Sequence, residues 1–222
     1  GSRDLFSEAG FAVLEKLLVD VDGRPFPALM KETVLDPAGM SESTYESPLP
    51  EAWRVRAASG HRGDGRAVEG GWFDYPARAA KGLWATPTDL AVFGAAVMEA
   101  AAGKPSSLLG PAAARAMLTP RVGVRSLGFV VEGATRERLL VSLQGRTDGF
   151  ASMLVMVPDK SQAAVIMANG DNGELLIGEI LRALSAAYGW AYFKPEEKAL
   201  YRLDPSVSGS YVGRYRLGSG AV

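Results

Sequence analysis

The spacing of apolar residues changes near residue 126, and this change constrains the fold more than any other feature of the chain. Before it, apolar residues recur every three or four positions, which places them on one face of an α-helix. After it, short β-prone runs alternate with connections that contain Gly, Pro or Asp, a pattern typical of antiparallel strands. The sequence therefore predicts an α+β protein in which helices come first and an antiparallel sheet follows.

The part before residue 126 is predicted to be mainly helical. Between Glu8 and Val21 the apolar residues share one helical face, which we expect to be buried: Phe11, Leu14, Leu17, Leu18 and Val21. Gly23 follows as a C-terminal stop. Caps and apolar spacing predict further helices over residues 25–37, 86–103 and 111–118. Residues 46–80, rich in Gly, Pro, Arg and Asp, are predicted to form a long surface excursion.

The part after residue 126 is predicted to form a sheet with one covering helix. The β-prone runs are Leu127–Glu132, Arg138–Leu143, Ala151–Val157 and Ala163–Ala168. A final helix over Glu174–Tyr188 has a broad apolar face that should pack on the sheet. We therefore expect one unit over residues 1–192, helical over 1–125 and sheet plus helix over 126–192. Residues 193–222 are predicted to form a linker and the start of an appended small β-domain.

Composition excludes several classes of function. The 222 residues carry 24 basic and 25 acidic side chains, a formal net charge of −1, so no bulk attraction to nucleic acid is expected. Cysteine is absent, which excludes disulfides and thiolate catalysis and leaves a periplasmic or a cytoplasmic location open. No run approaches the roughly 20 apolar residues of a membrane span. We expect a folded protein that uses no metal or other cofactor.

Several segments occur in an order that resembles a known enzyme family. Phe6-Ser7-Glu8 opens a helix and Leu35–Thr44 closes the next one, followed by Ala79–Ala91, Gly149-Phe150 and Met167–Gly173. Together these segments resemble the serine β-lactamase-like hydrolases, namely class C β-lactamases, D-alanyl-D-alanine carboxypeptidases and related esterases. The resemblance covers roughly residues 1–192 and implies a β-lactamase/transpeptidase-like fold. It also implies N-terminal strands and a nucleophile helix that these residues lack, so Ala163–Ala168 should have an unpaired edge.

The resemblance implies acyl transfer by a Ser in a Ser-x-x-Lys motif, assisted by a Tyr-x-Asn triplet and a Lys-Thr-Gly-like strand. None of the seven Lys residues has a Ser three positions before it, so the nucleophile is expected on a missing N-terminal segment or a second chain. Phe6-Ser7-Glu8 occupies the Tyr-x-Asn position and Leu143-Gln144-Gly145 the third motif. A phenyl ring cannot transfer a proton, and Leu143 replaces the charged or hydrogen-bonding pocket residue.

Other residues offer alternatives for the lost groups. Glu8 is either a general base or a solvated carboxylate stabilised by the helix dipole, and Arg146 is either a clamp for a substrate carboxylate or a surface residue. His61 is the sole histidine and is interpreted as a loop residue, because one histidine cannot form a zinc site. Some aromatic residues either rim an acyl pocket or pack the excursion onto the helices: Trp72, Phe73, Tyr75 and Trp84.

Two hypotheses about function follow. The first is part of a serine hydrolase that acts on an ester, an amide, a β-lactam or a peptidoglycan-like substrate, inactive as this chain alone and favouring esters. The second is a non-catalytic binding or structural protein on the same scaffold, since every motif is altered. Apolar surface at the vacated helix site would favour dimerisation, so a homo-oligomer is a further expectation.

Overall fold

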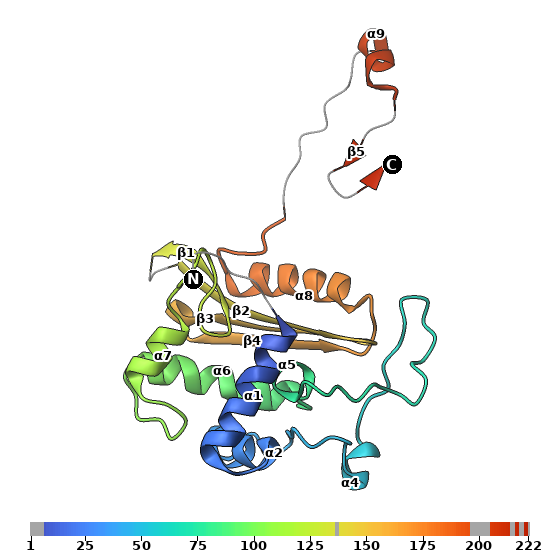
Figure 1. Ribbon diagram of the computed structural model, residues 1–222. Helices are drawn as coiled ribbons and strands as arrows, with labels where there is room; N and C mark the ends of the chain where they lie inside the picture. The colour runs from blue at the N-terminus through green and yellow to red at the C-terminus, as the bar shows by residue number, and fades with distance from the viewer. Residues whose placement is uncertain (1–6, 136–137, 196–204, 214–215, 218–219, 222) are drawn as a thin grey trace.

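A computed structural model describes residues 7–135, 138–195, 205–213, 216–217 and 220–221 (Figure 1). The helical part contains α1 (Glu8–Asp22), α2 (Phe26–Met30), the π-helical turn Lys31–Leu35, α3 (Asp36–Ala38), α4 (Glu51–Arg54), α5 (Arg78–Lys81), α6 (Pro87–Ala101) and α7 (Pro111–Met117). The sheet part contains β1 (Val130–Thr135), β2 (Arg138–Thr147), β3 (Phe150–Val157), a 3-10 turn (Pro158–Lys160), β4 (Gln162–Ala168) and α8 (Gly173–Tyr188). The predicted change from helices to strands is confirmed.

The four strands form one antiparallel sheet in the order β1-β2-β3-β4. β4 therefore lies at an edge, and within the described residues it pairs only with β3. The predicted unpaired edge at Ala163–Ala168 is confirmed for this part of the chain. At the other edge, β1 pairs with β2 only as far as Ser142, so Leu143–Thr147 extend beyond it.

Helices cover both faces of the sheet. Successive residues of a strand point to opposite faces, so each strand contributes side chains to two separate cores. Leu154 and Met156 of β3 belong to the core on the α6 side, together with Val97. Val155 and Val157 belong to the core on the α8 side, together with Ile177, Leu181 and Trp190. Figure 1 shows α8 on one side of the sheet and α6 and α7 on the other. The sheet is the middle layer of a three-layer arrangement.

The start of α6 is fixed by polar contacts that the sequence predicted in part. The Thr86 hydroxyl accepts a hydrogen bond from the Asp89 N–H at 3.2 Å, as expected of an N-cap. The buried Asp89 carboxylate accepts hydrogen bonds from the Glu42 N–H (2.8 Å) and the Ser43 hydroxyl (2.7 Å). Asp89 thereby ties the start of α6 to the segment after α3.

The expectation that the apolar face of α1 is buried is wrong. Leu14, Leu17, Leu18 and Val21 are exposed, and the one buried residue of α1 is Glu15. The Glu15 carboxylate accepts hydrogen bonds from the Ala79 N–H (2.9 Å) and from Nε of Arg78 (3.2 Å), so polar contacts hold α1 to α5. The apolar stripe exists as the spacing predicts, but the described residues do not cover it.

The apolar face of α8 is narrower than predicted. Ile177 and Leu181 are buried against the sheet, whereas Leu175 and Leu176 are exposed. After α8 the described parts of the tail contain α9 (Pro205–Ser208), a 3-10 turn (Gly209–Tyr211) and a strand pair, β5 (Arg216–Leu217) with β6 (Gly220–Ala221). Whether residues 193–222 begin an appended β-domain stays a prediction. Among the described helices, none has the length and apolar character to cross a membrane.

Candidate active site

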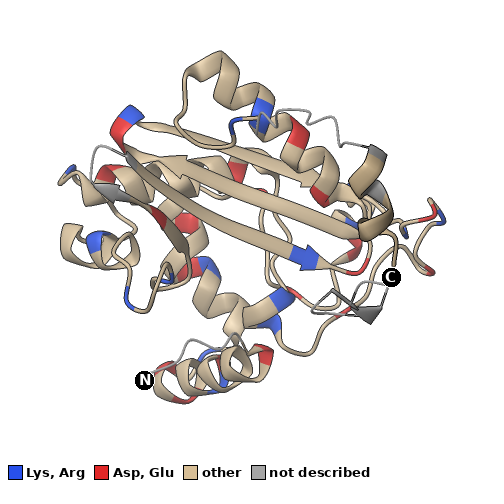
Figure 2. Ribbon diagram, turned by 90° about the horizontal axis from the view of Figure 1, so that it is seen from above, with Lys and Arg blue, Asp and Glu red and all other residues tan. Residues whose placement is uncertain are grey.

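A large cavity lies between α1, α5, the excursion of residues 46–80 and β2. Its volume is about 1720 Å³, and its lining includes Phe11 and Leu14 of α1, Lys81 of α5, and Leu143–Asp148. Part of the apolar face of α1 therefore borders this cavity. Figure 2 shows acidic and basic residues interspersed over the helices and strands.

The motif on β2 is divided between the two faces of the sheet. Leu143 pairs with Leu154 and Gly145 with Ser152, which places both on the face of α6 and the large cavity. Leu143 is 42% exposed, so an apolar side chain borders the cavity where the resembled family has a polar group. A Cβ added to Gly145 would lie 2.4 Å from Oγ of Ser152. Glycine is therefore required there unless the Ser152 side chain moves.

Gln144 and Arg146 point to the other face, toward α8. Nε2 of Gln144 donates to Oε1 of Glu174 at 3.0 Å, and Nη1 of Arg146 donates to the same oxygen at 3.2 Å. Both residues also border the large cavity at its rim. Arg146 is thus already engaged with a carboxylate of this chain, and its role as a clamp for a substrate carboxylate stays a prediction.

The triplet at the start of α1 is described in part, since Phe6 lies outside the described residues. Ser7 is the N-cap of α1, and its hydroxyl accepts a hydrogen bond from the Gly10 N–H at 3.2 Å. Oε1 of Glu8 lies 2.7 Å from Nζ of Lys81, which also sits 5.1 Å from the ring centroid of Tyr75. Lys81 is thus held between a carboxylate at the start of α1 and the aromatic face of Tyr75.

Tyr75 and Asp148, which line the cavity, form a network with Arg62 that no local sequence pattern predicted. The Tyr75 hydroxyl donates to Oδ2 of Asp148 at 2.7 Å and accepts from the Asp148 N–H at 3.0 Å. Nη1 of Arg62 donates to Oδ1 of Asp148 at 2.8 Å. The hydrogen bonds from Arg62 and then from Tyr75 hold the pKa of the Asp148 carboxyl below its ordinary value. Burial, followed by the hydrogen bond to Asp148, raises the pKa of Tyr75, which favours the protonated form of its phenol.

Aromatic side chains line the cavity and also pack on one another, and whether they rim an acyl pocket stays a prediction. The ring centroids of Trp72 and Trp84 are 5.1 Å apart at 75°, and those of Trp84 and Phe150 are 6.1 Å apart at 77°. Both are edge-to-face arrangements, which are favourable for aromatic pairs. Trp72, Phe73, Tyr75 and Trp84 all border the cavity. Its wall therefore combines an apolar aromatic part with the polar network of Tyr75.

The middle of the excursion forms hydrogen bonds with the loop between β4 and α8. Nδ1 of His61 lies 3.0 Å from the Asn169 carbonyl oxygen, and Nδ2 of Asn172 donates to the Gly63 carbonyl at 2.7 Å. Oδ1 of Asp171 accepts from the Gly149 N–H at 2.7 Å. His61 thus lies in a loop, as interpreted from the sequence. In the part of the chain that the structure describes, no group of three or more His, Cys, Asp or Glu is arranged to hold a metal ion.

The fold and the cavity define a β-lactamase or penicillin-binding-protein type of scaffold, and comparison with known proteins agrees. The sequence model of the Beta-lactamase family matches residues 1–187. The chain belongs to this family. No curated protein matches the sequence.

Solved structures show the same fold at low sequence identity. SurE aligns with a TM-score of 0.68 and 24% identity over 97% of this chain and 52% of its own. The penicillin-binding protein from Bacillus halodurans gives 0.68 and 22% over 83% of this chain and 57% of its own. The octameric penicillin-binding protein homologue from Pyrococcus abyssi gives 0.67 and 20% over 86% of this chain and 44% of its own. This chain spans about half the length of these proteins.

Proposed function

We propose that this chain forms the substrate-binding walls of a serine hydrolase that transfers an acyl group from an ester, amide or β-lactam. The nucleophilic Ser and its Lys come from a Ser-x-x-Lys segment outside these 222 residues, on the same polypeptide or on a second chain. The observation that carries the proposal is the large cavity of about 1720 Å³ beside the free part of β2. An α-helix with its side chains is about 10–12 Å across. A cavity of this size accommodates a short helix and a small substrate.

The free part of β2 supports the proposal, because strand edges bind extended substrates. β1 stops pairing at Ser142, so the next residues of β2 present main-chain N–H and C=O groups toward the cavity side. A substrate backbone could add to this edge by strand pairing, which fixes its carbonyl relative to the nucleophile. Trp72 and Trp84 would then contact the apolar part of the acyl group.

The reaction follows from these parts. The Ser oxygen attacks the carbonyl carbon, the bond to the leaving group breaks, and the leaving group takes up a proton as the acyl-enzyme forms. Water then attacks the acyl carbonyl and releases the Ser and an acid. In this chain Phe6 carries no phenol, so the proton must be handled by the external Lys or by Glu8, which lies beside Lys81. The apolar Leu143 favours a neutral ester over a carboxylate-bearing β-lactam, because it offers no charged partner.

The second candidate function is a non-catalytic binding protein on the same scaffold. It is favoured by the altered residues at each motif position, Phe6, Glu8 and Leu143. Such a protein would use the aromatic wall and the free strand edge to hold a peptidoglycan or lipid fragment without cleaving it.

Labelling with a fluorophosphonate probe distinguishes the two functions. The probe phosphonylates an activated Ser, and intact-protein mass spectrometry reports the added mass. The experiment compares the 222-residue chain with the same chain joined to the sequence encoded upstream. The proposal expects no adduct on the chain alone and one adduct, on the Ser of Ser-x-x-Lys, in the longer protein.

Two controls make the result decisive. Replacing the labelled Ser by Ala must abolish the adduct in the longer protein. An adduct on the 222-residue chain alone would contradict the external nucleophile. A longer protein that stays unlabelled and yet binds a peptidoglycan fragment would contradict the hydrolase and support the binding protein.

A further inference from the structure

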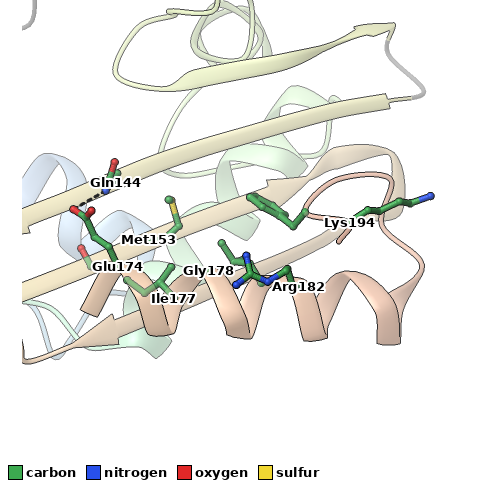
Figure 3. A pocket seen from close by; sticks show the side chains of 10 residues that line it. Gln144, Met153, Glu174, Ile177, Gly178, Arg182 and Lys194 are labelled. Carbon is green, nitrogen blue, oxygen red and sulfur yellow. Dashed lines mark hydrogen bonds between the residues drawn. The ribbon is translucent and has the colours of Figure 1, made fainter. Parts of the chain in front are cut away.

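A second, smaller cavity lies on the other face of the sheet, between α8 and strands β2 and β3 (Figure 3). Its volume is about 210 Å³. Four of its ten lining residues have apolar side chains: Met153, Ile177, Leu181 and Phe193. Phe193 has a φ of 55°, a left-handed backbone conformation that bulky residues rarely adopt. The chain after α8 thus turns so that this ring borders the cavity.

Gly178 keeps one wall of the small cavity open. It lies inside α8, where glycine is less favourable than alanine. At Gly173 a Cβ would lie 2.7 Å from the Cβ of Ala168, so close packing explains that glycine. At Gly178 the nearest atom to a Cβ would be Nη1 of Arg182 at 3.8 Å, an ordinary contact. Packing does not require glycine at position 178, and its effect is to leave space.

Three charged residues line the small cavity, the acid Glu174 and the bases Arg182 and Lys194. Glu174 at one end already accepts hydrogen bonds from Gln144 and Arg146. Arg182 lies beside Gly178 and forms an exposed ion pair with Glu179. Exposed pairs of this kind are weak and exchange readily. Lys194 also borders the cavity, although its amine extends away from the other labelled side chains in Figure 3.

We propose that the small cavity binds a carboxylate with an unbranched apolar chain, such as a medium-chain fatty acid. At roughly 30 Å³ for each water-sized group, a volume of 210 Å³ holds a chain of about seven such groups. The chain lies on Met153, Ile177 and Leu181, and the carboxylate pairs with Arg182. This site goes beyond the proposed acyl transfer and does not depend on it. The two cavities share four lining residues: Gln144, Ser152, Met153 and Glu174.

Isothermal titration of the 222-residue chain with octanoate tests the site. The proposal expects saturable binding of one octanoate per chain, and weaker binding of 1-octanol, which lacks the charge. Gly178→Leu fills the cavity and should weaken octanoate binding at least about tenfold, whereas Arg182→Met should weaken it about fivefold without affecting 1-octanol. Circular dichroism and thermal unfolding verify that each variant is folded. If Gly178→Leu does not fold, the octanoate affinity of Arg182→Met is the test of the site.

Matched variants separate this cavity from its neighbours. Lys194→Met should change octanoate affinity less than Arg182→Met does, because its amine points away from the cavity. Leu143→Ala, in the large cavity, should leave octanoate affinity unchanged. The proposal is overturned by the absence of saturable binding, by unchanged affinity in folded Gly178→Leu and Arg182→Met, or by a loss in Leu143→Ala as large as in Gly178→Leu.

Discussion

Glu15→Ala should release α1 from the wall of the large cavity. The side chain of Glu15 is 12% exposed and that of its partner Arg78 is 34% exposed. The substitution removes a charge-assisted hydrogen bond to the Ala79 N–H and a partly screened ion pair. Loss of a hydrogen bond to a charged group costs about 1.5–3 kcal/mol. The ion pair with Arg78 adds little, because solvent screens the partly exposed guanidinium. We therefore expect α1 to be destabilised by about 2–3 kcal/mol.

Hydrogen exchange measures this change directly, because α1 contributes few buried apolar contacts and can open as a local unit. Amides in the second half of α1 should exchange about 30- to 160-fold faster in Glu15→Ala, the factor that corresponds to 2–3 kcal/mol. Glu15→Gln keeps an acceptor for the Ala79 N–H, so its effect should be about 1 kcal/mol.

Asp20→Ala is the matched control on the same helix. Asp20 pairs with Lys16 in an exposed ion pair, with side chains 55% and 73% exposed, so its loss should cost less than about 0.5 kcal/mol. Equal exchange rates in Glu15→Ala and Asp20→Ala would refute the reasoning that one polar residue anchors α1.

Three further predictions follow from the same structure. Gly149→Ala should destabilise the protein by more than about 2 kcal/mol in urea unfolding, because its φ is 82° and a Cβ would lie 2.8 Å from the Cα of Gly60; Gly178→Ala should instead stabilise by up to about 1 kcal/mol. If Gly149→Ala lost less stability than Gly178→Ala, both predictions would be contradicted. The pKa of Asp148 is lowered by Arg62, so its charged form stabilises the fold above the ordinary value of 3.8, and this contribution disappears as the pH falls through the lowered value. Asp148→Asn should therefore shift the urea midpoint at pH 7 and not at about pH 2, and a shift of the same size at both would contradict the pairing. Leu17→Glu, at a residue 54% exposed, should reduce self-association measured by light scattering without lowering thermal stability, and unchanged association would show that the α1 stripe is not the contact.

Local sequence signals predicted the order and type of the elements well. Thr86 forms the N-cap of α6, and the predicted strand Ala151–Val157 is β3, Phe150–Val157. These signals depend on neighbours in sequence, so caps and spacing suffice to find them. The sequence could not tell whether the α1 stripe is covered, because amphipathic spacing implies a complementary surface without locating it. Glu15, an acid beside Leu14 in that stripe, was the available signal for a polar anchor.

The sequence predicted those residues of the candidate site that belong to contiguous motifs. It did not predict contacts between residues that are far apart in the sequence. Leu143 and Gly145 were found by counting along the chain from Gly149-Phe150, and both border the large cavity. The hydrogen bond from Tyr75 to Asp148 spans 73 residues, and no local pattern identifies such a pair. The same holds for the contact of Glu8 with Lys81.

We propose that a helix with a nucleophilic Ser occupies the cavity between α1 and β2. A crystal structure of this chain joined to a Ser-x-x-Lys segment would locate that Ser. We expect the segment to form a helix in the cavity, to cover Leu14 of α1 and to point its Ser toward Gly145 of β2. A segment that packs elsewhere and leaves Leu14 and Leu143 exposed would refute the proposal.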